Sequence, residues 1–62
     1  MTGPTEERYR KLKHDLANPL SAILAETQML LLGADRLDEA TAASLKQIEA
    51  MCRRMRSMLQ AD

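Results

Sequence analysis

The sequence predicts an all-α fold: an antiparallel helical hairpin that pairs with a second copy of itself into a homodimeric four-helix bundle. Three observations support this prediction. The 62 residues are rich in Ala, Leu, Met, Glu, Lys, Arg and Gln, which favour helices, with one Tyr and no Phe or Trp. Apolar residues recur at helical spacing along two stretches. A chain of this length buries little surface alone, and its single cysteine allows no internal disulfide.

The first helix is expected over about residues 5–32. Either Thr5 caps its N-terminus, or Gly3 does so with Pro4 in the first turn. Glycine commonly follows the last turn of a helix, and Gly33 stands where the helical pattern stops.

The second helix is expected over about residues 38–60, after a short turn at 33–37. Asp38 is its expected N-cap. A connection this short makes the two helices antiparallel neighbours, so residues 1–62 form one domain.

Both expected helices carry broad apolar stripes when residues are placed at about 100° intervals. The stripe of the second helix has the four-and-three spacing of packed helices and comprises Thr41, Leu45, Ile48, Cys52, Met55 and Leu59. The stripe of the first comprises Tyr9, Leu12, Leu16, Leu20, Ile23, Thr27 and Leu30 or Leu31, and Leu24 widens this face. One hairpin cannot bury two such faces against each other, so a second hairpin is expected to cover the remainder.

Composition argues against several other functions. Met51, Cys52, Met55 and Met58 suggest either a soft-metal site or ordinary core filling, and their place on or beside the stripe favours the core, so no metal site is expected. Nine basic and nine acidic residues cancel, and no aromatic residues are available to stack bases, which argues against nucleic acid. No apolar run approaches the ~20 residues that cross a bilayer, so no direct membrane contact is expected. The lone thiol suits a cytoplasmic location, whether the parent protein is soluble or membrane-anchored.

The segment KHDLANPLSAIL holds the chain's only histidine, His14, with Asp15 beside it and Asn18 and Pro19 one turn further on. Asn18 could cap a separate helix with Pro19 in its first position. The apolar stripe keeps its phase across this point, however, so we favour one continuous helix with the proline inside it. An interior proline costs roughly 3 kcal/mol and deprives the Asp15 carbonyl of its donor, so a kink is expected here.

The surroundings of His14 suggest nucleophilic chemistry. His14 and Asn18 both lie about 160° from the stripe, so the imidazole should point outward. No serine has a base at a spacing that suits a catalytic triad. A neutral imidazole can itself act as a nucleophile near neutral pH. Asp15 could hold the proton of one ring nitrogen and leave the other to attack, although adjacent helical residues do not naturally face each other.

The segment HDLANPL, residues 14–20, resembles the H-box of sensor histidine kinases. That pattern is a histidine, an acid, an apolar residue, any residue, threonine or asparagine, proline and an apolar residue. Nearly the whole chain resembles the family's dimerisation and histidine phosphoacceptor domain, a hairpin that forms a homodimeric four-helix bundle. The resemblance implies that the chain is part of a protein-histidine kinase of two-component signal transduction.

The resemblance also implies a role for each polar residue of the motif. His14 would accept the γ-phosphoryl group of ATP and pass it to an aspartate in the receiver domain of a response regulator. Asp15 would act as base and orienter in the first transfer. Asn18 would position water when the domain helps to dephosphorylate the regulator, and Pro19 would permit the bend that these steps use.

The family's kinase activity needs an ATP-binding domain C-terminal to this one, whereas this chain ends at Asp62 and shows no Gly-rich phosphate loop. The chain is therefore expected to act as a phosphoryl acceptor and docking module with no cofactor of its own, while a separate catalytic domain binds ATP with Mg. The alternative is a helical dimerisation module without phosphate chemistry. Acid-labile, base-stable phosphate after incubation with a partner kinase and ATP would distinguish the two.

Small residues follow the histidine on the same face of the expected first helix. Ser21, Ala22 and Ala25 share that face with His14 and Asn18 and leave room for a partner's surface. They are interpreted as regulator-binding residues, with ordinary helix surface as the alternative.

Basic residues gather at the open end of the expected hairpin, on both sides of the histidine. They are interpreted either as solvated charges that suit the dipole of a helix end or as a positive collar that attracts phosphate. Arg53 and Arg54 face away from the stripe and are the candidates for phosphate steering, whereas Arg56 lies nearer the stripe.

Overall fold

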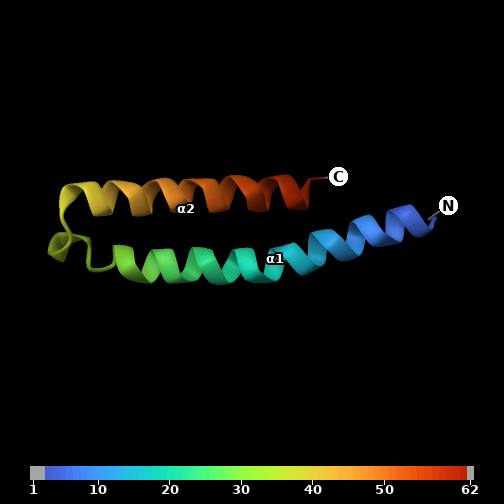
Figure 1. Ribbon diagram of the computed structural model, residues 1–62, viewed down its shortest axis with the longest axis horizontal. Coiled ribbons are helices and arrows are strands. Elements are labelled where there is room, and N and C mark those ends of the chain that lie inside the picture. Colours follow the sequence, from blue (N-terminus) through green and yellow to red (C-terminus); the bar gives the residue numbers. More distant parts are fainter. Residues whose placement is uncertain (1–2, 62) are drawn as a thin grey trace.

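The computed structural model describes residues 3–61, which form two helices joined by a short connection (Figure 1). Helix α1 spans Pro4–Leu31, a 3-10 turn η1 spans Ala34–Arg36, and helix α2 spans Glu39–Gln60. The helices run antiparallel, so the hairpin is an extended rod of 52 × 14 × 12 Å (Figure 1). The predicted all-α hairpin is confirmed, and the dimer stays a prediction.

The starts of both helices follow from local sequence. Gly3 occupies the N-cap of α1 and Pro4 its first turn, where the missing N–H of proline is harmless. Of the two predicted caps, the one with Gly3 therefore forms. At the start of α2, Asp38 Oδ1 accepts a hydrogen bond of 2.9 Å from the backbone N–H of Thr41. The predicted Asp38 cap is confirmed.

The end of α1 differs in mechanism from the expectation. The helix stops at Leu31, and Gly33 follows, but Gly33 has a φ of −103° and does not use the left-handed conformation that favours glycine. Instead the last carbonyls of the helix accept hydrogen bonds that include the closer, three-residue spacing, such as one of 3.2 Å from the Gly33 N–H to the Leu30 carbonyl.

Helix α1 continues through Pro19 without a break, as the phase of the apolar stripe predicted. Figure 1 shows the helix changing direction near its middle, in the part that contains this proline. The cause is the pyrrolidine ring, which replaces the N–H that would bond to the Asp15 carbonyl. His14 therefore lies in the half of α1 that precedes the bend, and the first turns of that half extend beyond the end of α2 (Figure 1).

The core of the hairpin is small. Its buried apolar residues are Leu20, Leu24 and Cys52, against which Leu59 packs. Thr27 is buried beside them, and its hydroxyl donates a hydrogen bond of 2.7 Å to the Ile23 carbonyl, so no polar atom is left unpaired there. Only one edge of each apolar stripe is used in this contact.

The other edge of each stripe is open to solvent in the single chain. Half or nearly half of the surface of several large side chains is exposed, namely Leu12, Leu16, Ile23, Ile48, Met51, Met55 and Met58. On this side an apolar groove of about 310 Å³ runs between the helices and is lined by Leu16, Ile23 and Met55 among others. Leu16 and Ile48, which were expected to be buried in the bundle, are 45% and 43% exposed in the hairpin alone.

Cys52 should react slowly with thiol reagents in the native protein. Its side chain is only 3% exposed, because it lies in the contact between α1 and α2. The measurement compares the labelling rate under native conditions with the rate in denaturant. Equal rates would contradict the observed packing.

Two further features of residues 3–61 bear on function. Neither helix in this range is both long and apolar enough to cross a membrane. The same residues contain no cluster of three or more His, Cys, Asp or Glu side chains that could hold a metal ion.

Candidate functional site

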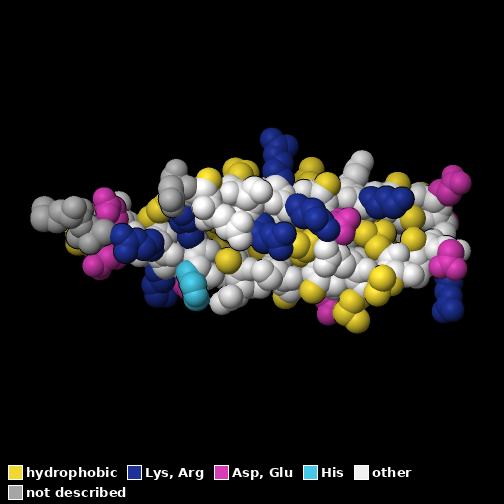
Figure 2. Space-filling view, turned by 180° about the vertical axis from the view of Figure 1, so that it is seen from behind, with side chains coloured by type: hydrophobic (Ala, Val, Ile, Leu, Met, Phe, Trp, Pro, Cys, Tyr) yellow, Lys and Arg dark blue, Asp and Glu magenta, His cyan; other side chains and the backbone are white. Residues whose placement is uncertain are grey.

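The candidate site lies on α1 in the turn before the bend. The side chain of His14 is 79% exposed, in agreement with its predicted outward direction. Figure 2 shows the ring projecting from the surface, with Lys and Arg side chains nearby. Because the imidazole packs into no core, it contributes little to the stability of the hairpin.

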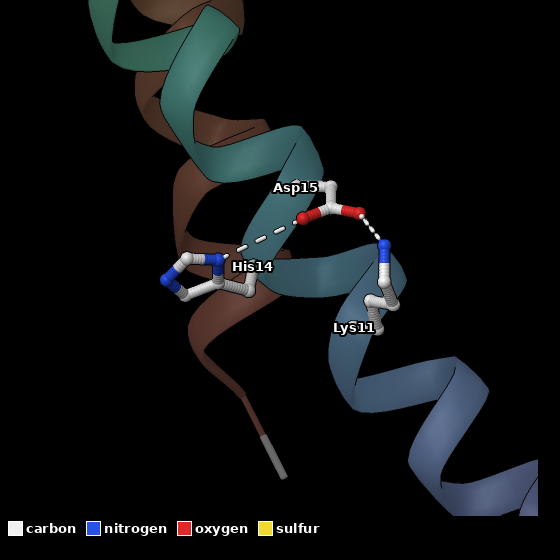
Figure 3. A network of polar contacts seen from close by, with 3 residues as sticks. All are labelled: Lys11, His14 and Asp15. Atoms are coloured by element: carbon white, nitrogen blue, oxygen red, sulfur yellow. Dashed lines mark hydrogen bonds and ion pairs between the residues drawn. The ribbon is translucent and has the colours of Figure 1, made fainter.

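Asp15 lies between the side chains of Lys11 and His14 (Figure 3). Its Oδ2 accepts a hydrogen bond of 3.0 Å from Lys11 Nζ, one helical turn earlier. Its Oδ1 lies 3.8 Å from His14 Nδ1, which is within ion-pair range but too long for a hydrogen bond. Figure 3 shows Nδ1 turned toward Asp15 and the second ring nitrogen, Nε2, pointing away from it into open space. The side chains thus adopt the relative orientation that adjacent helical residues do not reach by default.

The hydrogen bond from Lys11 lowers the pKa of Asp15 below its ordinary value. Desolvation opposes this effect, and the charge of Lys11 and the neighbouring His14 lower the pKa of Asp15 further. Asp15 is therefore ionised at neutral pH, so its carboxylate is available to accept a hydrogen bond from a proton on Nδ1. The pairing of Lys11 with Asp15 was not predicted, although the four-residue spacing between them is the usual signal for such a pair.

The remaining residues of the motif are also accessible. Asn18 is exposed one turn after His14, and within residues 3–61 its side chain has no hydrogen bond partner. Its amide is free to bind water or a partner protein. The three small residues beyond it are exposed as well: Ser21, Ala22 and Ala25.

A hollow of about 300 Å³ lies beside the histidine, between the two helices. Its lining comes from both helices: Arg10, Lys13, His14, Ala17, Ser21, Arg56, Leu59 and Gln60. Three of these side chains are cationic and none is acidic. The hollow therefore brings positive charge from α1 and α2 together next to the imidazole.

Arg53 and Arg54, the predicted phosphate-steering residues, do not line this hollow. Arg53 instead forms an ion pair of 3.3 Å with Glu49, and Arg54 is exposed on the surface of α2. Arg56 does line the hollow. The prediction chose Arg53 and Arg54 because they lie opposite the apolar stripe. The hollow instead lies where the contact between the helices meets solvent, and Arg56 is half-buried at this border.

A comparison with protein-family models matches residues 9–61 to the family described as His Kinase A (phospho-acceptor) domain, HisKA. The matched range includes the whole of α2, most of α1 and every predicted site residue. Searches of curated proteins and of solved structures gave no significant match.

Proposed function

This chain belongs to the His Kinase A (phospho-acceptor) domain family, and we propose that His14 is the residue on which it accepts a phosphoryl group. The family supplies the phosphoacceptor and dimerisation part of histidine kinases, which are transferases of two-component signalling. The observation that carries the proposal is that the sequence contains a single histidine, which is exposed and lies inside the matched range.

The proposed donor is ATP held with Mg by a separate ATP-binding domain. The lone pair of Nε2 attacks the γ-phosphorus, the N–P bond forms, and the bond to the leaving oxygen breaks, so that ADP departs with the electron pair. The proton remains on Nδ1, and the Asp15 carboxylate stabilises the positive ring that results. Two features support this assignment: Nδ1 faces Asp15, and Nε2 faces open space. The 3.8 Å separation must shorten to hydrogen-bond range during the reaction.

The proposed acceptor in the second step is an aspartate in the receiver domain of a response regulator. The N–P bond to His14 breaks as an O–P bond to the aspartate forms. The regulator would dock on the part of α1 that follows the histidine. The exposed side chains of Ser21, Ala22 and Ala25 are small there and leave space for another protein.

Ala22→Met should slow transfer to the regulator while leaving the melting temperature unchanged. Methionine is a good helix former, and Ala22 is exposed, so the added bulk meets solvent in the free domain but a partner surface in the complex. The rate of phosphate transfer to the cognate receiver measures the effect. Ala43→Met, on the exposed surface of α2, is the matched control. Equal transfer rates in both variants would show that the regulator docks elsewhere.

Asp15→Asn and Asn18→Ala should have different defects. Asp15→Asn keeps the shape of the side chain but removes the charge that faces Nδ1, so phosphorylation of His14 should fall sharply. Asn18→Ala should still accept phosphate but should fail to accelerate dephosphorylation of the regulator, because the free amide that positions water is lost. Helicity should not fall in Asn18→Ala, since alanine is the better helix former.

The two reactions are measured separately, with an ATP-binding domain supplied in trans for the first and the phosphorylated regulator for the second. If Asp15→Asn and Asn18→Ala show the same defect in both reactions, the separate roles proposed for Asp15 and Asn18 are wrong.

We further propose that a second copy of the chain covers the open edge of the hairpin. Members of the family generally dimerise, and the apolar groove between α1 and α2 supplies the surface to be buried. Two such hairpins would close a four-helix bundle in which Leu16, Ile23, Ile48 and Met55 face the partner. The alternative function, a dimerisation module without phosphate chemistry, would use the same surface. It is distinguished from the proposed function if no acid-labile, base-stable phosphate forms on the chain during incubation with a partner kinase and ATP.

A further inference from the structure

The cations around the hollow retain unneutralised charge. Among the described residues neither Arg10 nor Arg56 forms an ion pair. Lys13 donates a hydrogen bond of 3.0 Å to the Ala61 carbonyl and lies 5.4 Å from the centre of the Tyr9 ring. These contacts hold Lys13 at the border of the hollow but cancel none of its charge.

The geometry brings the charges to one side of the imidazole. Arg10 precedes His14 by one helical turn, so the two share a face of α1, while Arg56 approaches from α2. The nearest acid in sequence, Asp15, is paired with Lys11 and is not part of the hollow. Ala17 and Ser21, which also line the hollow, are small and occupy little of its space. The apolar side chain of Leu59 adds a wall of low polarity, which strengthens the field of the cations inside.

We propose that this hollow binds a phosphate dianion, with Arg10 and Arg56 as its ligands, and that it holds the phosphoryl group while His14 carries it. Guanidinium groups suit this role because their planar fork donates paired hydrogen bonds to phosphate oxygens. The second half of the proposal rests on the proposed function, whereas the binding of a free phosphate ion does not. Arg10 and Arg56 are thus phosphate-binding residues that act beside the nucleophile, and Lys13 adds charge at the rim.

The first test uses inorganic phosphate as the probe. Amide chemical shifts of the chain are followed during a phosphate titration at low ionic strength, in the native protein and in Arg10→Gln/Arg56→Gln. The native protein should show saturable shifts around Arg10, His14 and Arg56, and the double variant should bind about fivefold more weakly or worse, since two charges are lost. Added salt should weaken binding in the native protein.

The control variant is Arg36→Gln/Lys46→Gln, which changes net charge equally but alters the connection and the exposed surface of α2. Its phosphate affinity should stay within about twofold of the native value, because its charges lie away from the hollow. Helicity and melting temperature are measured for every variant. Arg10→Lys/Arg56→Lys keeps both charges but loses the paired donation of the guanidinium groups, so it should bind phosphate more weakly than the native protein and more tightly than the glutamine variant. If the glutamine variant does not fold, an unchanged phosphate affinity in the lysine variant overturns the assignment of these two ligands.

The second test examines the covalently attached phosphoryl group. His14 is phosphorylated chemically with potassium phosphoramidate, and the phosphorus NMR signal is followed against pH. Arg10, Lys13 and Arg56 favour the dianion, so the titration midpoint should be lower in the native protein and the control than in Arg10→Gln/Arg56→Gln. A role of the arginines in folding alone would not move this midpoint between folded variants.

Equal phosphate affinities and equal midpoints in all folded variants would overturn the proposal. Normal phosphate binding by Arg10→Gln/Arg56→Gln, combined with loss of transfer to the regulator, would also overturn it and would make the hollow a protein contact. If phosphate binds as expected but a partner kinase with ATP never phosphorylates His14, the proposed function fails and the anion site stands.

Discussion

Ile48→Glu should convert the proposed dimer into a monomer or unfold it, whereas Ala50→Glu should leave the proposed dimer intact. In the lone hairpin Ile48 is 43% exposed, so a carboxylate there reaches water at little cost. In a four-helix bundle the same position faces the second hairpin, and an unpaired charge buried there costs at least ~2 kcal/mol. Ala50 is exposed and lies on the far side of α2, about 160° away from Ile48.

Sedimentation at micromolar concentration measures this difference directly. The native chain and Ala50→Glu should sediment as dimers, and their melting temperatures should rise with protein concentration. A native chain that is fully helical and monomeric under these conditions would rule out the bundle. So would a dimer of Ile48→Glu as stable as the native one.

His14→Gln should abolish the proposed phosphate incorporation without changing the fold. Glutamine is a good helix former, and the His14 side chain is 79% exposed, so the free energy of unfolding should stay within about 0.5 kcal/mol of the native value. Incorporation is measured with a partner ATP-binding domain and ATP labelled in its γ-phosphate. Phosphate that still enters His14→Gln at the native rate would place the acceptor on another residue, because the chain has no second histidine.

Helical periodicity explains why much of the fold was predictable. A helix fixes the direction of each side chain, so the phase of the apolar stripe was enough to predict a continuous α1 through Pro19 and an outward His14. The Asp38 cap was predictable because an acid directly before a helical pattern has a specific partner, here the N–H of Thr41.

Contacts between the helices were less predictable. The sequence shows a broad stripe but does not show which edge packs within the hairpin, so Leu24 and Cys52 are buried while Ile48 is not. The positions of the basic residues relative to His14 were unpredictable for the same reason. Whether Arg54 or Arg56 lies beside His14 depends on the rotation of α2 against α1, which only the packing determines.

The orientation of the imidazole could not be read from the sequence either. Adjacent helical residues point in different directions, and it is the choice of rotamers that brings His14 Nδ1 to 3.8 Å from Asp15. The bond between Lys11 and Asp15 holds the carboxylate in place for this contact. The proposal that Nε2 is the attacking atom therefore rests on the orientation of the ring and not on the sequence.

The most direct measurement is nitrogen-resolved NMR of the chain after phosphorylation by a partner ATP-binding domain with ATP. With the imidazole nitrogens labelled, coupling to phosphorus identifies the bonded atom. We predict acid-labile, base-stable phosphate with its phosphorus coupled to Nε2 of His14. Acid-stable phosphate on another residue, or phosphorus coupled to Nδ1, would contradict the proposed phosphoacceptor chemistry.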